Sequence, residues 1–490
     1  MTRATSRLAL TMLAAISACA VGPDYQRPEA VTPAAYKETD GWKPSEPRDL
    51  VNRGAWWSIY DDPVLDGLAR QIEISNQTLK AAEAAFRQAR AIVGEGRAGF
   101  FPTVTLDGSG QRSGQGSGAG GTSGTSRTSV SRSRVANQFN LTATASWELD
   151  VWGRIRRTVE SDVAGAQASA ADLAAARLSA QATLVTDYFQ LRIDDELKRL
   201  LDDTVEAFAR ALQITQNRYA QGISARSDVA SAQAQLEQTR SQAINVGIQR
   251  AQLEHAIAVL IGKPPAEFAI AAVPLKTVVP VMPPGLPSTL LERRPDIAAA
   301  ERRMQAANAQ IGVAVAAYFP TLTLSGSYGF VSSALDTLLR ASNAVWSFGP
   351  QLAETAFDGG LRAAQVEAAR ATYDQNVADY RQTVLADFQQ VEDELAALRI
   401  LEQQAAVQDA AVRAAQEAER LIFNQYVAGT VAYTSVITAQ TIALADRQNA
   451  LTILQNRLVA SAVLVEALGG GWSAPELPTR EQIIGDAPGY

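Results

Sequence analysis

The clearest pattern in the chain is a strict alternation of apolar and polar residues over positions 138–151. Every odd position is apolar and every even position is polar. Because successive side chains of a β-strand point to opposite faces, this pattern predicts a strand with one apolar face. Fourteen residues are enough to cross a bilayer when the strand is tilted. Shorter alternating segments predict three more strands, and hence two hairpins, at 103–109, 321–330 and 345–352.

Between the strands the apolar period is that of a helix. Proline, which breaks helix interiors, is absent from 103–263 and from 351–474. A helix from Arg154 to Gln221 would be roughly 100 Å long. An elongated helical bundle is therefore expected. Its apolar seams step by three and four, at Leu197, Leu201, Val205, Phe208 and Leu212 and at Val377, Tyr380, Val384, Phe388, Val391, Leu395 and Leu398.

An internal repeat organises the chain. Phe101-Pro102-Thr103 recurs 218 residues later as Phe319-Pro320-Thr321, and Tyr219-x-x-Gly222 recurs 207 residues later as Tyr426-x-x-Gly429. Each half therefore reads as helix, hairpin, helix, helix. We expect the short helices, near 63–99 and 226–262 in the first half, to stack end to end against the long one.

The repeat and the proline-rich stretches suggest a division of the chain. The predicted parts are a signal peptide (1–18), an N-terminal segment and belt (19–63), a first repeat (64–263, hairpin about 101–151, turn 219–228), a proline-rich linker (264–290), a second repeat (291–469, hairpin about 319–357, turn 426–438) and a tail (470–490).

The predicted hairpins lack a partner for their apolar faces. Outside the N-terminus no run approaches the ~18 apolar residues of a membrane-spanning helix, so any crossing must use β-strands. Four strands cannot close a membrane barrel, which needs about eight, so oligomerisation is required if they span lipid. The alternative is a small soluble sheet with one wet face. The residues expected to face lipid are Phe139, Leu141, Leu149, Trp346 and Phe348.

The N-terminus reads as an export signal, with Arg3 and Arg7 before an apolar core at 8–17. Its end, Ile16-Ser17-Ala18-Cys19, resembles the lipobox of bacterial lipoproteins, which implies cleavage before Cys19 and acylation of that cysteine, including palmitate. Ala20 is not the Asp that often retains lipoproteins in the inner membrane, so the resemblance implies outer-membrane sorting. The alternative is a plain signal peptide with an incidental cysteine.

Composition excludes several classes of function. Without the two signal arginines, 42 basic residues face 51 acidic ones, a net charge of −9 that argues against a nucleic-acid partner. One Cys and one His cannot supply a zinc site or a Cys/His pair. The acidic clusters 194–196 and 392–394 splay around a helix and do not converge on a metal. We expect no catalytic residues, no metal and no cofactor other than the acyl lipid on Cys19.

Several short motifs stand at the ends of the predicted strands and helices. They are Leu291-Glu292-Arg293-Arg294-Pro295-Asp296-Ile297, Ile311-Gly312, Tyr318-Phe319-Pro320, Trp147-Glu148-Leu149-Asp150 before Gly153-Arg154, and Phe357-Asp358-Gly359-Gly360. This set resembles that of TolC-like outer membrane efflux factors, in the lipoprotein branch often called NodT-type. The resemblance implies a mixed α/β fold in which three protomers pool four strands each into a twelve-stranded outer-membrane barrel, continued by a periplasmic α-helical coiled-coil tunnel with a small equatorial belt.

The same resemblance implies function and partners. It describes a passive, homotrimeric exit duct that receives small toxic compounds or drugs from an inner-membrane pump, of RND type, through a periplasmic adaptor (membrane fusion) protein. Exit ducts of type I protein secretion are the alternative within transport. A non-conducting lipoprotein tether in the outer membrane is the alternative from another class.

The gate is expected at the two helical turns. In better-known relatives acidic residues follow the second turn, whereas residues 429–440 here carry no charge. We therefore expect Tyr426 to hydrogen-bond to Asp228 in place of a salt bridge, and Thr434 and Thr438 to line a constriction. The alternative is that these residues pack the turns or contact the adaptor. The candidates are Tyr219, Gly222, Asp228, Tyr426, Gly429, Thr434, Ser435 and Thr438.

Overall fold

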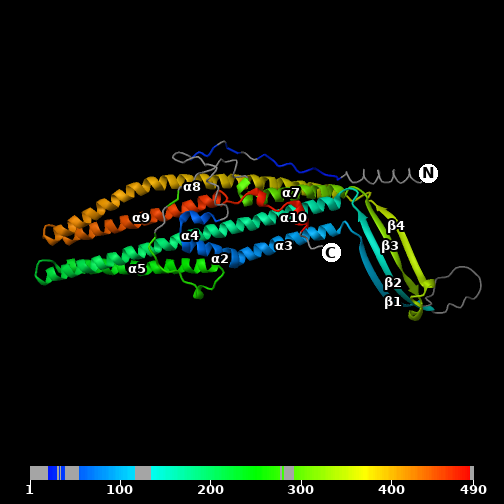
Figure 1. Ribbon diagram of the computed structural model, residues 1–490, viewed down its shortest axis with the longest axis horizontal. Helices are drawn as coiled ribbons and strands as arrows, with labels where there is room; N and C mark the ends of the chain where they lie inside the picture. Colours follow the sequence, from blue (N-terminus) through cyan, green and yellow to red (C-terminus); the bar gives the residue numbers. More distant parts are fainter. Residues whose placement is uncertain are drawn as a thin grey trace, which may run out of the picture.

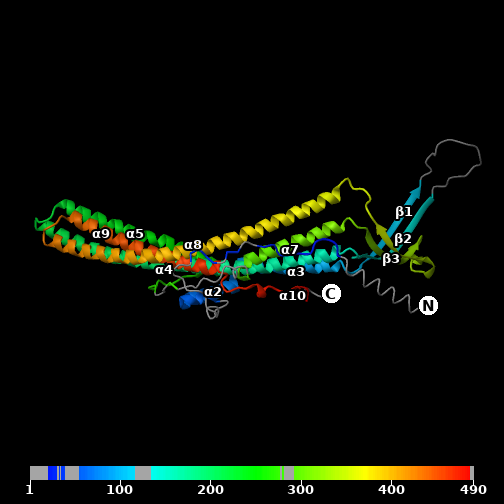
Figure 2. The ribbon, with the colours of Figure 1, turned by 90° about the horizontal axis from the view of Figure 1, so that it is seen from above.

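The computed structural model describes residues 20–29, 32–33, 35–38, 55–115, 134–275, 279–280 and 292–485. Figure 1 shows a long helical bundle with a four-stranded sheet at one end, and Figure 2 shows the same elongated shape after a quarter turn. In chain order the elements are η2 (Trp56–Tyr60), α2 (Pro63–Ser75), α3 (Gln77–Ala98), β1 (Thr103–Gln115), β2 (Arg134–Leu149), α4 (Arg154–Ala220), α5 (Arg226–Leu260), η3 (Pro265–Glu267), α7 (Pro295–Ala316), β3 (Thr321–Ser332), η4 (Leu335–Thr337), η5 (Ala341–Asn343), β4 (Ala344–Ala353), α8 (Leu361–Val427), α9 (Tyr433–Ala467), η6 (Ala474–Glu476) and α10 (Arg480–Gly485).

The two halves have matching helix lengths. The long helices α4 and α8 have 67 residues each, α3 and α7 have 22 each, and α5 and α9 have 35 each. Helices α3 and α5 both pack on α4, and α7 and α9 both pack on α8. The predicted stacking of two short helices along one long helix is therefore confirmed. Helix α4 also packs against α7 and α9, so it joins the two halves.

The same backbone joint connects the short helices in each half. Gly262 follows α5 with φ 68°, and Gly469 follows α9 with φ 90°. A Cβ at Gly262 would overlap the carbonyl oxygen of Ser75, and a Cβ at Gly469 would overlap that of Arg293. Positive φ and this close approach both require glycine. The two joints are 207 residues apart at the glycine, the spacing of the two tip turns.

In each joint a side chain hydrogen-bonds to a carbonyl at the end of the helix that precedes the glycine. This side chain is neutral in the first half and charged in the second. Asn76 Nδ2 donates a 2.8 Å hydrogen bond to the carbonyl of Leu260 in the first half. Arg294 Nη1 donates at 3.2 Å to the carbonyl of Ala467 in the second. Each bond satisfies an orphan carbonyl at the end of a helix. The second joint therefore carries a buried cation where the first carries a neutral amide.

Asn76 also corrects one prediction. The single helix expected over 63–99 is interrupted at this residue, whose ψ of 122° lies outside the helical region. Its side-chain oxygen accepts from the backbone N–H of Leu79 at 2.9 Å and so caps α3. The helical periodicity of the sequence continues across this break, which is why the pattern did not reveal it.

The four strands form one antiparallel meander in the order β1-β2-β3-β4. The register places Ala143 opposite both Leu106 and Tyr328, and Tyr328 opposite Trp346. Since directly paired residues share a face, the alternating patterns of all four strands coincide. One face is almost entirely apolar across the sheet. The other face carries Thr105, Asp107, Ser109, Asn140, Thr142, Thr144, Ser146, Thr323, Ser325 and Ser327.

An aspartate caps each long helix where it leaves the sheet. Asp150 accepts hydrogen bonds from the N–H groups of Ile155 (2.8 Å) and Arg156 (2.9 Å) at the start of α4. Asp358 accepts from the N–H of Gly360 (3.0 Å) and from the guanidinium of Arg362 (2.6 Å) at the start of α8. These contacts explain the acidic residue shared by the two strand-to-helix motifs.

One described helix, α9, is long and apolar enough to span a membrane by length and composition alone. This finding corrects the expectation that no segment outside the N-terminus is apolar over the length of a membrane-spanning helix. Helix α9 packs along α8 and also contacts α4, so its apolar residues form part of the bundle.

The joint in the second half contains a buried carboxylate with only one of its two oxygens paired. Asp387 on α8 lies 2.6 Å from Arg294, and its second oxygen is buried without a hydrogen-bond partner in the described chain. Burial, helped by nearby Asp296 and opposed by Arg294, raises the pKa of Asp387 to about 7. The unfolded pKa is about 3.9, so the stability contributed by protonated Asp387 is complete below pH ~4 and is lost as the pH rises through ~7.

We therefore predict that Asp387→Asn reduces the pH dependence of stability. Between pH 4 and 7 the wild-type melting temperature should fall further than that of the variant, because in this range one group contributes up to ~1.4 kcal/mol per pH unit. Thermal melts followed by circular dichroism measure this slope. Asp379→Asn, at an exposed position on the same helix, is the control and should keep the wild-type slope. An unchanged slope in Asp387→Asn would contradict the assignment.

Candidate functional site

The end of the bundle far from the sheet consists of two tight turns (Figure 1). Gly222 follows α4 with φ 74°, and Gly429 follows α8 with φ 80°. In each turn a backbone N–H just past the helix donates a hydrogen bond to a carbonyl in the last helical turn. Ile223 donates to Arg218 at 2.9 Å, and Thr430 donates to Gln425 at 3.0 Å. This is the glycine-terminated helix end that the Tyr-x-x-Gly motif predicts.

A small apolar core lies directly behind the turns. It joins all four helices of the tip, since Phe208 and Leu212 come from α4, Leu236 from α5, Tyr426 from α8 and Val436 from α9. The rings of Tyr426 and Tyr433 are 5.0 Å apart. Burial, with Tyr426 nearby, raises the pKa of Tyr433 to about 12, so its hydroxyl stays neutral at physiological pH.

Arg218 connects the two hairpins across the tip. Its guanidinium stacks over the ring of Tyr426 at 4.9 Å, and its Nη1 donates a 2.7 Å hydrogen bond to the carbonyl of Val427 at the end of α8. A cation at the C-terminus of a helix is favourable because the helix dipole is negative there. Arg218 thus holds the last turn of α8 against the last turn of α4. We call the contacts among Arg218, Ser224, Tyr426 and Thr215 the tip latch.

The polar groups of the tip latch form one chain of hydrogen bonds. Arg218 Nε donates to Ser224 Oγ at 3.3 Å, and Ser224 Oγ shares a 3.1 Å bond with the hydroxyl of Tyr426. The Tyr426 hydroxyl donates to Thr215 at 3.3 Å, and Thr215 donates to the carbonyl of Ala211 at 2.9 Å. Each hydroxyl thereby has both a donor and an acceptor, which makes the chain cooperative.

The expected hydrogen bond between Tyr426 and Asp228 is not formed within the protomer. Asp228 lies in the first turn of α5, where its carboxylate accepts from the N–H of Ala225 at 3.3 Å. An acidic side chain at this position is stabilised by the free N–H groups of its own helix. That local partner, and the reach of Arg218 to Tyr426, explain why the prediction was wrong.

The two copies of the turn motif differ in exposure. Tyr426 is 3% exposed, whereas its repeat counterpart Tyr219 is 46% exposed. Thr434, Ser435 and Thr438 are exposed on α9, and Thr438 donates back to the carbonyl of Thr434 at 3.0 Å. The constriction expected at these hydroxyls remains a prediction.

Sequence reasoning missed Arg218, Ser224 and Thr215. The repeat contained a usable signal, because the counterpart of Arg218 is the neutral Gln425. The two turns therefore differ at this position, and in the structure it is the cation of the first turn that reaches the second.

At the other end, the five residues expected to face lipid share one face of the sheet. Trp346 is 76% exposed and Phe348 is 70% exposed, while Phe139, Leu141 and Leu149 are half-buried. So large an exposed apolar surface marks a protein or membrane contact.

The chain just after Cys19 lies where this sheet meets the bundle. Val21 donates to the carbonyl of Trp152 at 3.1 Å, and a Cβ on Gly153 would come within 2.9 Å of the Cα of Ala20. The two halves of the chain also contact each other here, because the ring of Trp152 stacks on that of Phe319 with a centroid distance of 4.7 Å. Cys19 itself lies outside the described residues.

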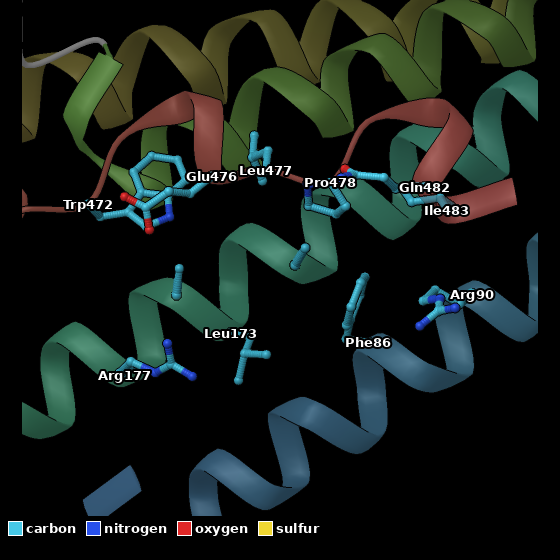
Figure 3. A pocket seen from close by; sticks show the side chains of 12 residues that line it. Phe86, Arg90, Leu173, Arg177, Trp472, Glu476, Leu477, Pro478, Gln482 and Ile483 are labelled. Carbon is cyan, nitrogen blue, oxygen red and sulfur yellow. The ribbon is translucent and has the colours of Figure 1, made fainter. Parts of the chain in front are cut away.

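A groove on the bundle wall has a volume of about 450 Å³ and lies between α3, α4 and the C-terminal segment (Figure 3). Its described lining combines two arginines, Arg90 and Arg177, with the rings of Phe86 and Trp472 and the carboxylate of Glu476. These residues do not pair a nucleophile with a base. Within the described residues no group of three or more His, Cys, Asp or Glu side chains could hold a metal ion.

The family model described as "Outer membrane efflux protein" matches residues 68–263 and 286–470. The chain belongs to this outer membrane efflux protein family. It is 29% identical over 491 residues to a probable efflux pump outer membrane protein, TtgC, of Pseudomonas putida, covering 100% of both chains. It is 28% identical to the cation efflux system protein CusC of Escherichia coli, covering 94% of this chain and 97% of CusC.

The outer-membrane channel OprN has a similar structure, with a TM-score of 0.84, 29% identity and coverage of 93% of this chain and 100% of OprN. The TolC-like fold, the location in the outer membrane of a Gram-negative bacterium and the role as an efflux exit duct, all predicted from sequence, are thereby confirmed. The family consists of efflux channel proteins.

If the tip latch keeps the duct closed, Arg218→Gln should open it. The variant removes a charge-assisted bond worth ~1.5–3 kcal/mol when shielded, which shifts an open–closed equilibrium by about tenfold or more. Single-channel recording of the purified protein in planar bilayers measures the open fraction. Arg210→Gln, on the same helix but paired with Glu206 at 3.7 Å, should behave as wild type. An open fraction equal to wild type in Arg218→Gln would refute the tip latch as a gate.

Proposed function

We propose that three copies of this chain form a passive duct through the outer membrane and periplasm. In this proposal their sheets close into a twelve-stranded barrel and their helices form the tunnel. The supporting observation is that β1 and β4 are edge strands of a sheet with one apolar face, and the described chain pairs neither edge further. A lipid-embedded sheet cannot leave its edges unsatisfied. The duct makes and breaks no covalent bond.

The exposed surface of α8 supports the same assembly. Leu361, Leu385, Ile400 and Val407 on this helix are each more than half exposed. Ile400 and Val407 are 7 residues apart, about two turns, so they lie on the same side of α8, and Leu385 lies within about 60° of them. Exposed apolar side chains on one side of a long helix normally pack against another helix. We place a neighbouring protomer on this surface, with outer-membrane lipid around the sheet and a periplasmic adaptor at the tip.

The cargo we propose is a class of small toxic compounds, delivered by an inner-membrane pump of RND type. Full-length relatives carry names such as toluene efflux, antibiotic efflux and cation efflux proteins, and these names describe small solutes. Type I protein secretion is the competing assignment of the cargo, and it makes a different experimental prediction.

We further propose that Cys19 is acylated and that the acyl chains, including palmitate, anchor the protein in the outer membrane. Ala20 lies at the junction of sheet and bundle, so an acylated neighbour would reach the membrane surface without further chain. Several acyl chains provide stable anchoring, at ~0.8 kcal/mol per buried CH₂.

Cys19→Ala should abolish labelling by radioactive palmitate, because the chain has no other thiol. Ser17→Ala, which keeps the cysteine, is the matched control and should still be labelled. Palmitate incorporation into Cys19→Ala would disprove acylation at this residue.

Deletion of the gene tests the duct and its cargo together. The deletion strain should become sensitive to solvents or antibiotics and regain resistance with the wild-type gene, while its secreted proteins stay unchanged. Loss of a secreted protein without a change in sensitivity would favour type I secretion. Unchanged sensitivity of the deletion strain together with unchanged secreted proteins would favour a non-conducting tether over the duct.

A further inference from the structure

Arg112 is the one charged side chain on the apolar face among the strand residues that the structure describes. It pairs with Asn137 across β1 and β2, and the alternation places both on the face of Leu106 and Leu141. Arg112 is exposed, and no hydrogen bond or ion pair joins its side chain to another described residue. Its position on an otherwise apolar face requires an explanation.

The height of Arg112 along the sheet explains why a charge is tolerated on this face. Along β2 this face is apolar from Leu149, next to the bundle, to Phe139. Ten steps of about 3.3 Å along a strand tilted by about 40° give an apolar height of about 25 Å, the height of the lipid-facing band of outer-membrane barrels. Asn137 and Arg112 are the next pair beyond Phe139, so they lie at the level of the outer headgroups.

The energetic cost of an arginine on the lipid face also favours a position at the outer headgroups. An arginine on the lipid face costs ~2–4 kcal/mol at the bilayer midplane and only ~0–1 near the interface. No counterion is available from the hairpin, because residues 108–147 contain four arginines and no Asp or Glu. Asp107 lies on the opposite face of β1, and Asp336 of the same chain lies in the β3–β4 connection, two strands away. The anion must therefore come from outside the hairpin.

We propose that Arg112, with Asn137 beside it, binds the phosphate groups of phosphorylated glycolipids in the outer leaflet. A guanidinium forms bidentate hydrogen bonds to a phosphate, and the Asn137 amide adds a further donor. The inference rests on the proposed contact between the apolar face and lipid. It assigns a specific lipid contact to each protomer at the outer rim of the sheet.

The test measures binding of bisphosphorylated lipid A to the purified full-length protein in detergent, by native mass spectrometry. Wild type should bind it at least about tenfold more tightly than dephosphorylated lipid A, as expected for a charge-assisted pair. Arg112→Gln should lose this preference and Arg112→Lys should keep most of it. Arg226→Gln, which alters an exposed arginine at the opposite end of the molecule, is the control and should bind as wild type.

Three results would overturn the proposal: no preference for phosphate in wild type, full preference in Arg112→Gln, or displacement of lipid A by millimolar inorganic phosphate, which would assign the site to free phosphate. Leu141→Arg separates this failure from failure of the membrane placement. That variant puts an arginine at mid-height and should greatly reduce membrane-inserted protein. Normal insertion of Leu141→Arg would show that the face does not contact lipid, whereas poor insertion combined with wild-type lipid A binding by Arg112→Gln would refute the phosphate site alone.

Discussion

A sheet of four strands with one apolar face and two open edges cannot be satisfied by one chain. The register aligns the apolar positions of all four strands, so the surface is continuous and is not scattered. Backbone groups at β1 and β4 need partners, and the face needs an apolar environment. Lipid on the face and neighbouring copies at the edges meet both needs.

The duplication explains how the helical part is built and where it becomes asymmetric. Both halves use a glycine joint to stack two short helices on one 67-residue helix. At the belt, neutral Asn76 in one half corresponds to buried Arg294 and Asp387 in the other. At the tip, Gln425 corresponds to Arg218, which connects the hairpins. Charge is thus added to a common frame at two places: at the belt it joins elements of the second half, and at the tip it connects the two halves.

Much of this architecture could be predicted because it depends on periodicity. Alternation over 138–151 determined which residues share a face, and proline-free tracts with a helical period indicated the long helices. The break at Asn76 could not be predicted, since it depends on a contact with Leu260 far away in sequence. The tip latch was missed for the same reason, and Asp228 was assigned to Tyr426 when its own helix end offered a nearer partner. Local patterns predict elements well, whereas polar pairing between elements depends on geometry that the sequence does not state.

The number of chains in the assembly tests the central claim most directly. Native mass spectrometry of the full-length protein, extracted from the outer membrane in mild detergent, counts the copies without a label. Three copies would provide twelve strands and close the sheet into a barrel. A monomer or dimer as the stable species would leave strand edges open in lipid and would contradict the account.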